Sequence, residues 1–298
     1  MDPVSDLKIL ILGASGMLGH KLYQHFSPRF VTTGTIRGEF SSVERFGIFD
    51  ETNIATNFDV LDAAELERRI SKIMPDVVIN AIGIVKQVPT AKDIITTLEI
   101  NSILPNRLAE FGAKYGYRLI AVSTDCVFDG VKGSYNENDV PNATDLYGKS
   151  KNLGEVTGDN CLTIRSSIIG RELATSHSLV EWFLSNRGGD VAGFTTAIYS
   201  GFPTIVFADI IESLIVEHKE LSGLYHVAAP PINKFELLQL INRYYDADIR
   251  ITPSDKLVID RSLDGSRFNS VTGFVSPDWE TLIKRMANDE TPYDSFRA

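Results

Sequence analysis

The chain has 298 residues, 43% of them hydrophobic, and a formal net charge of −10. This composition is typical of a packed globular protein, and the acidic balance argues against nonspecific binding to a nucleic-acid backbone. Cys126 and Cys161 are the only cysteines, too few for a disulfide framework and without metal-ligand spacing, so we expect no metal site. Neither a secretory signal nor an apolar run of about 20 residues is evident, so we expect a cytoplasmic protein with no membrane partner.

Short apolar runs alternate with amphipathic segments in the first half of the chain. The runs lack strict alternation, as expected of strands that are buried on both faces of a sheet. They span residues 8–13, 29–36, 76–83, 117–125 and 161–170. Between two of them, Leu104, Leu108 and Phe111 recur at helical spacing. Strands alternating with helices predict an α/β fold with a Rossmann-type, doubly wound parallel sheet.

The pattern becomes less regular after about residue 170. We expect residues 1–170, joined by part of 200–228, to form the sheet domain. Residues 171–298 should form a smaller, α-rich and discontinuous C-terminal lobe that binds the substrate. KFELLQLINRYY and SPDWETLIKRM both have one apolar face and predict helices. Ser276 is expected to cap the second helix, with Pro277 at its first position.

The glycine-rich stretch GASGMLG follows the first predicted strand and opens a helix. Gly13 allows a tight turn, Gly16 lets the backbone approach a pyrophosphate, and Gly19 permits close packing of the helix. The helix N-terminus offers free N–H groups and the positive end of its dipole. We therefore predict a dinucleotide site in the sheet domain. Its predicted binding residues in this loop are Gly13, Ser15, Gly16, Met17, Leu18 and Gly19.

The glycine spacing resembles that of the short-chain dehydrogenase/reductase superfamily. An acid at the end of the second strand would select NAD(H), but this sequence reads TIRGEFSS. Arg37 can hold the 2′-phosphate of NADP(H), so NADP(H) is the favoured cofactor. The alternative is that Arg37 is a solvated arginine in a loop and binds no phosphate. The resemblance further implies that Asp59 and Val60 lie at the adenine. It also implies that the NAIG stretch lines the cofactor with Asn80, Ala81, Ile82 and Gly83.

A second set of residues follows the strand YRLIAVSTD. Tyr147 comes 23 residues after Thr124, and Lys151 lies one helical turn beyond the tyrosine. The pKa of a free tyrosine is about 10, and a nearby cation such as Lys151 would lower it. This pattern resembles the superfamily's Ser/Thr and Tyr-x-x-x-Lys catalytic set. The resemblance makes Tyr147 the general acid, Thr124 a hydrogen-bond partner of the substrate oxygen, and Lys151 a ligand of the nicotinamide ribose beside Ser123.

Three short motifs follow one another along the chain: STDCVFDG, YGKSK and GE. Together they resemble the dTDP-4-dehydrorhamnose reductase group within the extended branch of the superfamily. GFPT, residues 201–204, is similar to that group's Gly-x-Pro-Thr near the sugar nucleotide. The resemblance implies NADPH-dependent reduction of a nucleotide-linked 4-keto-deoxysugar. A nucleotide sugar is the expected partner, and a homodimer is compatible with this group. The implied substrate-binding residues are Thr124, Asp125, Cys126, Tyr147, Ile168 and Pro203.

Three departures from the group lie where the sugar should bind. Cys126 replaces a tyrosine, Ile168 replaces a tryptophan, and VKQVPTAKD replaces the usual stretch after NAIG. We therefore expect the same type of reaction, and these departures leave open which sugar nucleotide is the substrate.

Other functions remain open from the sequence. One alternative is a noncatalytic, NADP-binding regulatory subunit like that of methionine adenosyltransferase, which resembles the same group. Another is a sugar-nucleotide epimerase, which uses the same tyrosine and lysine. A dehydratase is disfavoured, because that class places two acids after the threonine, where this chain has Asp125 and Cys126.

Four remaining side chains have weaker claims to a function. Cys126 is not expected to be a nucleophile, because the sequence indicates no histidine near it. His226 is predicted to be a core or domain-contact residue and not a base. Arg261 and Arg267 either meet a diphosphate or belong to a solvated loop.

Overall fold

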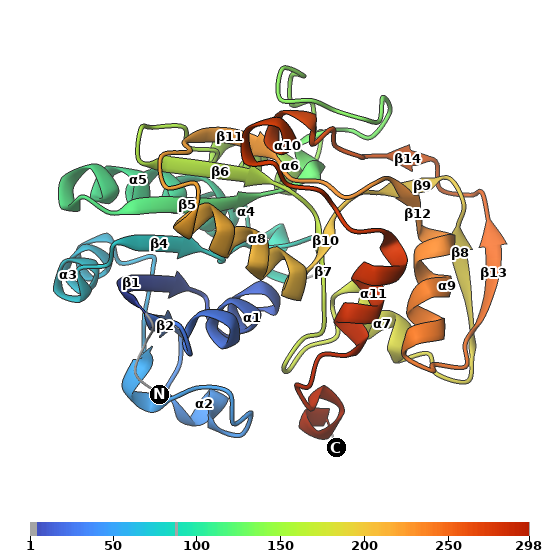
Figure 1. The fold of residues 1–298 in the computed structure, drawn as a ribbon, viewed down its shortest axis with the longest axis horizontal. Coiled ribbons are helices and arrows are strands. Elements are labelled where there is room, and N and C mark those ends of the chain that lie inside the picture. Colours follow the sequence, from blue (N-terminus) through green and yellow to red (C-terminus); the bar gives the residue numbers. More distant parts are fainter. Residues whose placement is uncertain (1–4, 87–88, 298) are drawn as a thin grey trace.

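The computed structural model describes residues 5–86 and 89–297. Its main feature is a seven-stranded sheet with the order β3-β2-β1-β4-β5-β6-β11, in which every neighbouring pair is parallel (Figure 1). The order reverses at the β1/β4 boundary, which is where open α/β sheets bind ligands. This confirms the predicted Rossmann-type fold. The strands are β1 (Ser5–Leu12), β2 (Phe30–Thr35), β3 (Ile54–Ala55), β4 (Val77–Asn80), β5 (Arg118–Ser123), β6 (Cys161–Arg165) and β11 (Gly223–His226).

Helices cover both faces of this sheet. Ile9 and Ile11 of β1 belong to the core on one face, under α1 (Met17–Phe26) and α8 (Thr204–Val216). Leu10 and Leu12 belong to the core on the other face, under α3 (Ala63–Ile73) and α5 (Leu104–Tyr115). Burial on both faces explains why the apolar runs in the sequence do not alternate. The shorter helices of this region are α2 (Ser41–Glu44), α4 (Ile94–Leu98) and α6 (Leu146–Leu153).

A second region lies at the right of Figure 1 and combines helices with small sheets. Its helices are α7 (Leu179–Leu184), α9 (Lys234–Tyr244) and α11 (Trp279–Ala287), while α10 (Ser266–Thr272) packs against β11 of the main sheet. The strands pair as β8 (Asp190–Phe194) with β13 (Arg250–Ser254), β9 (Ala197–Tyr199) with β12 (Ile232–Asn233) and β14 (Ile259–Asp260), and β7 (Ile168–Ile169) with β10 (Phe202–Pro203). Of these strands, the sequence predicted only β7, as the end of the run 161–170, because strands of two to five residues carry too little periodicity.

The two helices predicted in this region are both present, but one begins later than expected. Asn233 caps α9 by accepting a hydrogen bond from the backbone N–H of Glu236. For α11 the expected cap at Ser276 is wrong, because the Asp278 side chain accepts from the N–H of Thr281 at 2.7 Å. A carboxylate at this position both satisfies a free N–H group and faces the positive end of the helix dipole.

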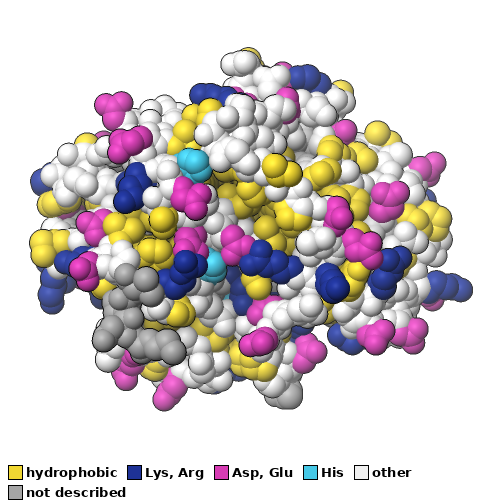
Figure 2. All heavy atoms as spheres, viewed as in Figure 1, with side chains coloured by type: hydrophobic (Ala, Val, Ile, Leu, Met, Phe, Trp, Pro, Cys, Tyr) yellow, Lys and Arg dark blue, Asp and Glu magenta, His cyan; other side chains and the backbone are white. Residues whose placement is uncertain are grey.

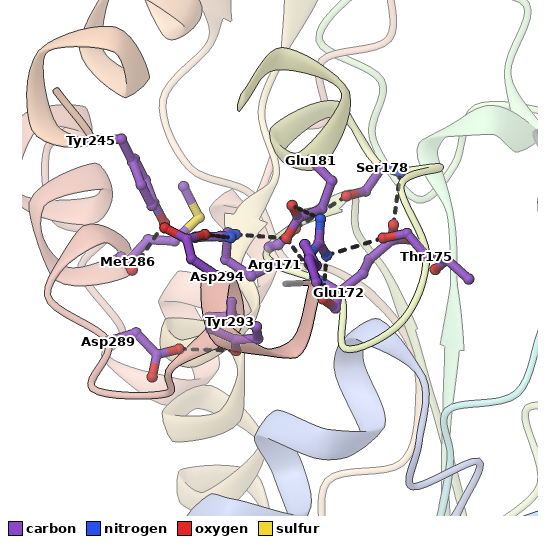
Figure 3. Close-up of polar contacts among 12 residues, drawn as sticks. Arg171, Glu172, Thr175, Ser178, Glu181, Tyr245, Met286, Asp289, Tyr293 and Asp294 are labelled. Atoms are coloured by element: carbon purple, nitrogen blue, oxygen red, sulfur yellow. Dashed lines mark hydrogen bonds and ion pairs between the residues drawn. The ribbon is translucent and has the colours of Figure 1, made fainter. Parts of the chain in front are cut away.

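A buried ion cluster holds the C-terminal residues against the rest of the protein (Figure 3). Arg171 pairs with Glu181 of α7 at 2.6 Å and also with Asp294, while Arg297 pairs with the other oxygen of Glu181. Glu181 is only 1% exposed. The hydroxyl of Tyr293 and Nε2 of His20 in α1 share a hydrogen bond of 2.7 Å. The end of the chain therefore also contacts the sheet domain.

The surface carries positive and negative side chains interspersed over the face seen in Figure 2. Within residues 5–86 and 89–297, no helix is long and apolar enough to cross a membrane. The same residues include no group of three His, Cys, Asp or Glu side chains arranged to hold a metal ion.

Candidate active site

The glycine loop between β1 and α1 has the shape of an anion site. Gly13 has a φ of +82°, in the left-handed region that favours glycine. A Cβ on Gly19 would lie 2.0 Å from the Gly13 carbonyl oxygen, so α1 packs closer to the loop than any side chain permits. Among the described residues, no side chain caps α1 at Gly16. The N–H groups of its first turn, which include those of Met17 and Leu18, therefore fit a pyrophosphate.

The segments that follow β2 and β3 lie side by side at the same edge of the sheet. Backbone hydrogen bonds of 2.9 and 3.0 Å join residues 36–38 to residues 57–58. Arg37 is exposed there, and Asp59 and Val60 follow directly on the neighbouring segment. The structure thus brings together the residues that were predicted to contact the adenosine end of the cofactor.

The predicted cofactor segment after β4 packs against the glycine loop. Asn80 is buried and its Oδ1 accepts a hydrogen bond from the N–H of Ile82 at 3.2 Å. A Cβ on Gly13 would lie 2.8 Å from the side chain of Ile82. Ala81 is half-buried and Gly83 is exposed beside this contact. Two segments that are about 70 residues apart therefore meet at the switch point of the sheet.

Asn101 connects the segment after β4 to α6, the helix that carries Tyr147 and Lys151. It lies in a π-helical turn, Glu99–Ile103, and its amide group bonds both the N–H and the carbonyl of Ile84, at 2.9 and 3.0 Å. Its Nδ2 also donates to the hydroxyl of Ser150 in α6 at 3.1 Å. Asn101 was not predicted to belong to the site, because a single Asn inside an apolar helical run carries no spacing signal. π-Turns often mark functional positions in helices.

The stretch DLYGKSK forms the start of α6, as its pattern suggests. Asp145 caps the helix by accepting from the N–H of Gly148 at 2.9 Å. A Cβ on Gly148 would lie 2.2 Å from the carbonyl oxygen of Cys126, so the helix packs directly on the turn that follows β5. This contact requires glycine and brings Tyr147 toward Thr124.

Tyr147 and Lys151 lie one turn apart on α6, but their environments differ from the prediction. Burial raises the pKa of Tyr147, the charge of Asp125 acts in the same direction, and a hydrogen bond with Thr124 opposes them. The Lys151 ammonium donates to the Val122 carbonyl at 2.6 Å, and burial lowers its pKa to about 8. The expected lowering of the tyrosine pKa by Lys151 is therefore wrong for this arrangement, in which the lysine is directed at the β5 backbone.

A buried network lies beneath the catalytic edge. The hydroxyl of Ser123, predicted to lie beside the cofactor, donates to Glu155 at 2.6 Å, and Arg165 forms two hydrogen bonds of 2.7 Å with the same carboxylate. His226 lies between Arg165 and the carbonyl of Tyr135. Burial and the charge of Arg165 lower the pKa of His226 to about 4. The prediction that His226 is a core residue is confirmed.

The predicted substrate residues come from three segments. Ile168 and Ile169 of β7 pair in parallel with Phe202 and Pro203 of β10, which places RSSII beside GFPT. Asp125 is buried and accepts a hydrogen bond from Thr124 at 3.1 Å. Burial raises the pKa of Cys126 to about 12, with Asp125 adding to the effect. A thiol that stays protonated at neutral pH is a poor nucleophile, in agreement with the sequence analysis.

Lys86 adds a cation that the sequence analysis did not assign to the site. Its ammonium pairs with Asp145 at 2.7 Å and lies 5.6 Å from the centre of the Tyr147 ring. It belongs to the unusual stretch VKQVPTAKD, of which Gln87 and Val88 lie outside the described residues.

The two arginines near residue 264 take different positions. Arg261 donates to the Phe128 carbonyl at 2.8 Å, and its positive charge acts to lower the pKa of Cys126. Arg267 lies over the ring of Tyr225, at 4.6 Å from its centre. Only Arg261 therefore lies near the residues that were predicted to bind substrate.

Comparisons with known proteins agree with this fold. The family described as the RmlD substrate binding domain matches residues 7–291. A dTDP-4-dehydrorhamnose reductase from Aggregatibacter actinomycetemcomitans is 28% identical over 94% of this chain and 89% of its own. The methionine adenosyltransferase 2 subunit beta of Xenopus tropicalis is 33% identical over 50% of this chain and 41% of its own.

Solved structures share the fold at lower identity. A dTDP-4-dehydrorhamnose reductase from Bacillus anthracis, in complex with NADP, has a TM-score of 0.77 and 22% identity over 94% of this chain and 98% of its own. The enzyme WbmG from Bordetella bronchiseptica, in complex with NAD and UDP, has a TM-score of 0.75 and 19% identity over 95% of this chain and 94% of its own.

The fold and the family match identify the protein as an extended short-chain dehydrogenase/reductase, a class of NAD(P)-dependent oxidoreductases. Within this class, the chain belongs to the RmlD substrate binding domain family.

Proposed function

We propose that this protein uses NADPH to reduce the 4-keto group of a nucleotide-linked deoxysugar. The observation that carries the proposal is the close packing of α6 on the turn after β5, where a Cβ on Gly148 would lie 2.2 Å from the Cys126 carbonyl oxygen, which brings Tyr147 toward Thr124 at the carboxyl edge of the sheet. The relative that aligns over most of the chain, a dTDP-4-dehydrorhamnose reductase, supports the same substrate class.

Each of the three residues has a defined task in this reaction. A bound nicotinamide supplies the hydride that the carbonyl carbon accepts. Tyr147 donates its proton to the carbonyl oxygen, and its raised pKa keeps that proton in place at neutral pH until negative charge develops on the substrate. The Thr124 hydroxyl has one proton, which it donates to Asp125 in this structure, and it rotates to donate that proton to the same carbonyl oxygen. Lys151 holds the nicotinamide ribose through its ammonium.

The direct test offers purified protein several nucleotide-linked 4-keto sugars with NADPH and follows the absorbance of the reduced nicotinamide. We expect oxidation of NADPH with at least one 4-keto-6-deoxysugar. An isomerised sugar without net oxidation of NADPH would identify an epimerase instead. Binding of NADPH without turnover of any sugar, together with a stable complex with a methionine adenosyltransferase catalytic subunit, would support the noncatalytic alternative.

The preference for NADP(H) is proposed to come from Arg37. Arg37 is exposed at the edge that also carries Asp59, where its guanidinium can pair with a 2′-phosphate. Replacement by Ala should therefore weaken NADPH binding by about 10-fold to 100-fold and leave NADH binding unchanged. Arg45→Ala, at another exposed arginine nearby, provides the matched control and should alter neither affinity. An Arg37→Ala variant that still prefers NADPH as strongly as the unmodified protein would rule out this assignment.

A further inference from the structure

His20 of α1 holds the glycine loop with its side chain as well as its backbone. The residue is fully buried, and its ring Nδ1 lies 2.8 Å from the carbonyl oxygen of Gly16. The backbone N–H of His20 donates to the same oxygen at 3.0 Å, in the usual pattern of an α-helix. The Gly16 carbonyl therefore accepts two hydrogen bonds from one residue, of which the side-chain bond is additional to the helix.

The two bonds fix the peptide plane between Gly16 and Met17. In a trans peptide, the carbonyl and the N–H that follows it point in opposite directions within one rigid plane. A Gly16 carbonyl that points along the helix toward His20 therefore directs the Met17 N–H out of the helix, to the side that fits a pyrophosphate. Glycine has no Cβ to restrict its backbone, so this plane rotates more easily than at another residue. The bond from the His20 ring opposes that rotation.

Tyr293 selects the form of the ring that can make this bond. Its hydroxyl lies 2.7 Å from Nε2 of His20 and 3.1 Å from a carboxylate oxygen of Asp289 (Figure 3). Burial lowers the pKa of His20 to about 4, so at neutral pH the ring carries a single proton. That proton is on Nδ1, because a bare Nδ1 would place its lone pair against the Gly16 carbonyl oxygen. Nε2 is then an acceptor, and the tyrosine hydroxyl donates to it.

The end of the chain that carries Tyr293 is held from two sides. Lys21 of α1 pairs at 2.6 Å with the same oxygen of Asp289, so this carboxylate keeps a donor when the tyrosine proton goes to the histidine. Both side chains of this pair are almost completely buried. On the other side, Asp294 pairs with Arg171 of the buried ion cluster. Tyr293 is therefore placed by contacts that do not involve the ring of His20.

We propose that His20 is a positioning residue for the cofactor, and that Tyr293 acts through it on the glycine loop. The part of the cofactor that depends on this contact is the pyrophosphate, because the Gly16 carbonyl orients the N–H of Met17. The adenosine end, which is proposed to lie at Arg37, is bonded elsewhere and should be unaffected. The inference rests on the proposed use of NADPH and does not depend on which sugar is reduced.

Two substitutions of His20 separate its two ring nitrogens. In His20→Asn, the side-chain amide can take the place of Nδ1 and donate to the Gly16 carbonyl. The longer side chain of His20→Gln reaches toward Tyr293 and leaves that carbonyl without its donor. By calorimetric titration, we expect the dissociation constant of NADPH to rise about fivefold to tenfold in His20→Gln and to stay within about twofold in His20→Asn. The dissociation constant of 2′-AMP, which has no pyrophosphate, should stay unchanged in both.

His25→Gln is the matched control near the other end of the same helix. The ring of His25 lies 2.6 Å from a carboxylate oxygen of Glu212, so its loss should leave the affinities for NADPH and 2′-AMP unchanged. Tyr293→Phe keeps the aromatic ring and removes only the donor to His20. It should weaken NADPH binding by about twofold to fivefold, and it provides the comparison if a His20 variant fails to fold.

A purely structural role for His20 predicts a different result. Both variants lose the same buried ring, so urea denaturation should show similar falls in the free energy of unfolding, while only His20→Gln loses affinity for NADPH. The positioning role would be overturned by equal NADPH affinities in the two variants, by a loss of 2′-AMP binding as large as that of NADPH, or by unchanged NADPH binding in Tyr293→Phe. If the unmodified protein binds no NADPH, the proposed function fails and the inference fails with it.

Discussion

The catalytic edge around Tyr147 and the ion cluster around Arg171 are both partly buried and rich in polar side chains, yet they are satisfied in opposite ways. In the cluster of Figure 3, Arg171 and Arg297 each pair with the buried carboxylate of Glu181. At the catalytic edge, burial raises the pKa of Tyr147 and lowers that of Lys151, and the Lys151 ammonium bonds a backbone carbonyl instead of a carboxylate.

This difference separates a structural site from a functional one. Charged groups that hold the fold together are paired within the protein, because an unpaired buried charge destabilises the folded state. Groups that act on a ligand must keep bonding capacity free, and their perturbed pKa values are typical of active sites. Mutations should therefore affect mainly stability in the cluster and mainly turnover at the catalytic edge.

The largest effect is expected for Tyr147→Phe. Without its proton donor, the reduction should slow by about 100-fold to 10,000-fold, while NADPH binding measured by fluorescence stays within about twofold. Tyr245→Phe, which removes a hydroxyl bonded to the Met286 carbonyl beside the ion cluster, should leave turnover unchanged. Turnover that survives in Tyr147→Phe would show that another group donates the proton.

A smaller effect, on stability, is expected for Glu181→Gln. This change leaves Arg171 and Arg297 without their shared buried carboxylate, so the free energy of unfolding should fall by about 3–5 kcal/mol. Urea denaturation measures the fall, and kcat should stay unchanged where the variant is folded. The comparison variant is Asp294→Asn, because Asp294 is 76% exposed and its pair should contribute at most about 1 kcal/mol. Similar losses in both variants would contradict the importance of burial in this cluster.

The smallest effect is a pH dependence that comes from Lys151. Its pKa of about 8 means that the ammonium loses its proton as the pH rises above 8. If the charged form holds the cofactor, the dissociation constant of NADPH should rise by up to about tenfold per pH unit above that value. Lys151→Arg keeps its charge throughout this range and should remove the dependence. A pH-independent affinity in the unmodified protein would show that this charge is not used for binding.

Deprotonation of Lys151 has the opposite effect on folding: as the pH rises, cofactor binding should weaken while the free energy of unfolding increases. Its folded pKa lies below the ordinary value of 10.5, so the folded protein binds this proton less tightly than the unfolded chain does. The unfavourable contribution of buried Lys151 is therefore complete below about pH 8 and diminishes as the pH rises toward 10.5.

Local patterns in the sequence were sufficient to predict most of the sheet domain. Apolar runs without alternation identified the buried strands, and the glycine spacing identified the turn into α1. The i to i+4 spacing placed Tyr147 and Lys151 on one face of a helix, which α6 confirms. The cap of α11 was misplaced by two residues, because Ser276 and Asp278 are both good caps and only the backbone geometry distinguishes them.

The sequence by itself thus determined the fold class, the glycine loop and the spacing of Tyr147 and Lys151, because each depends on neighbours within a few residues along the chain. The tertiary structure alone decided that Lys151 bonds the Val122 carbonyl, that Asn101 joins the β4 loop to α6, and that Ile169 pairs with Pro203. These contacts join residues 17 to 49 positions apart, and no local periodicity encodes them. They arise only when the helices and strands pack, which is why the reaction type was easier to predict than the residues that select the sugar.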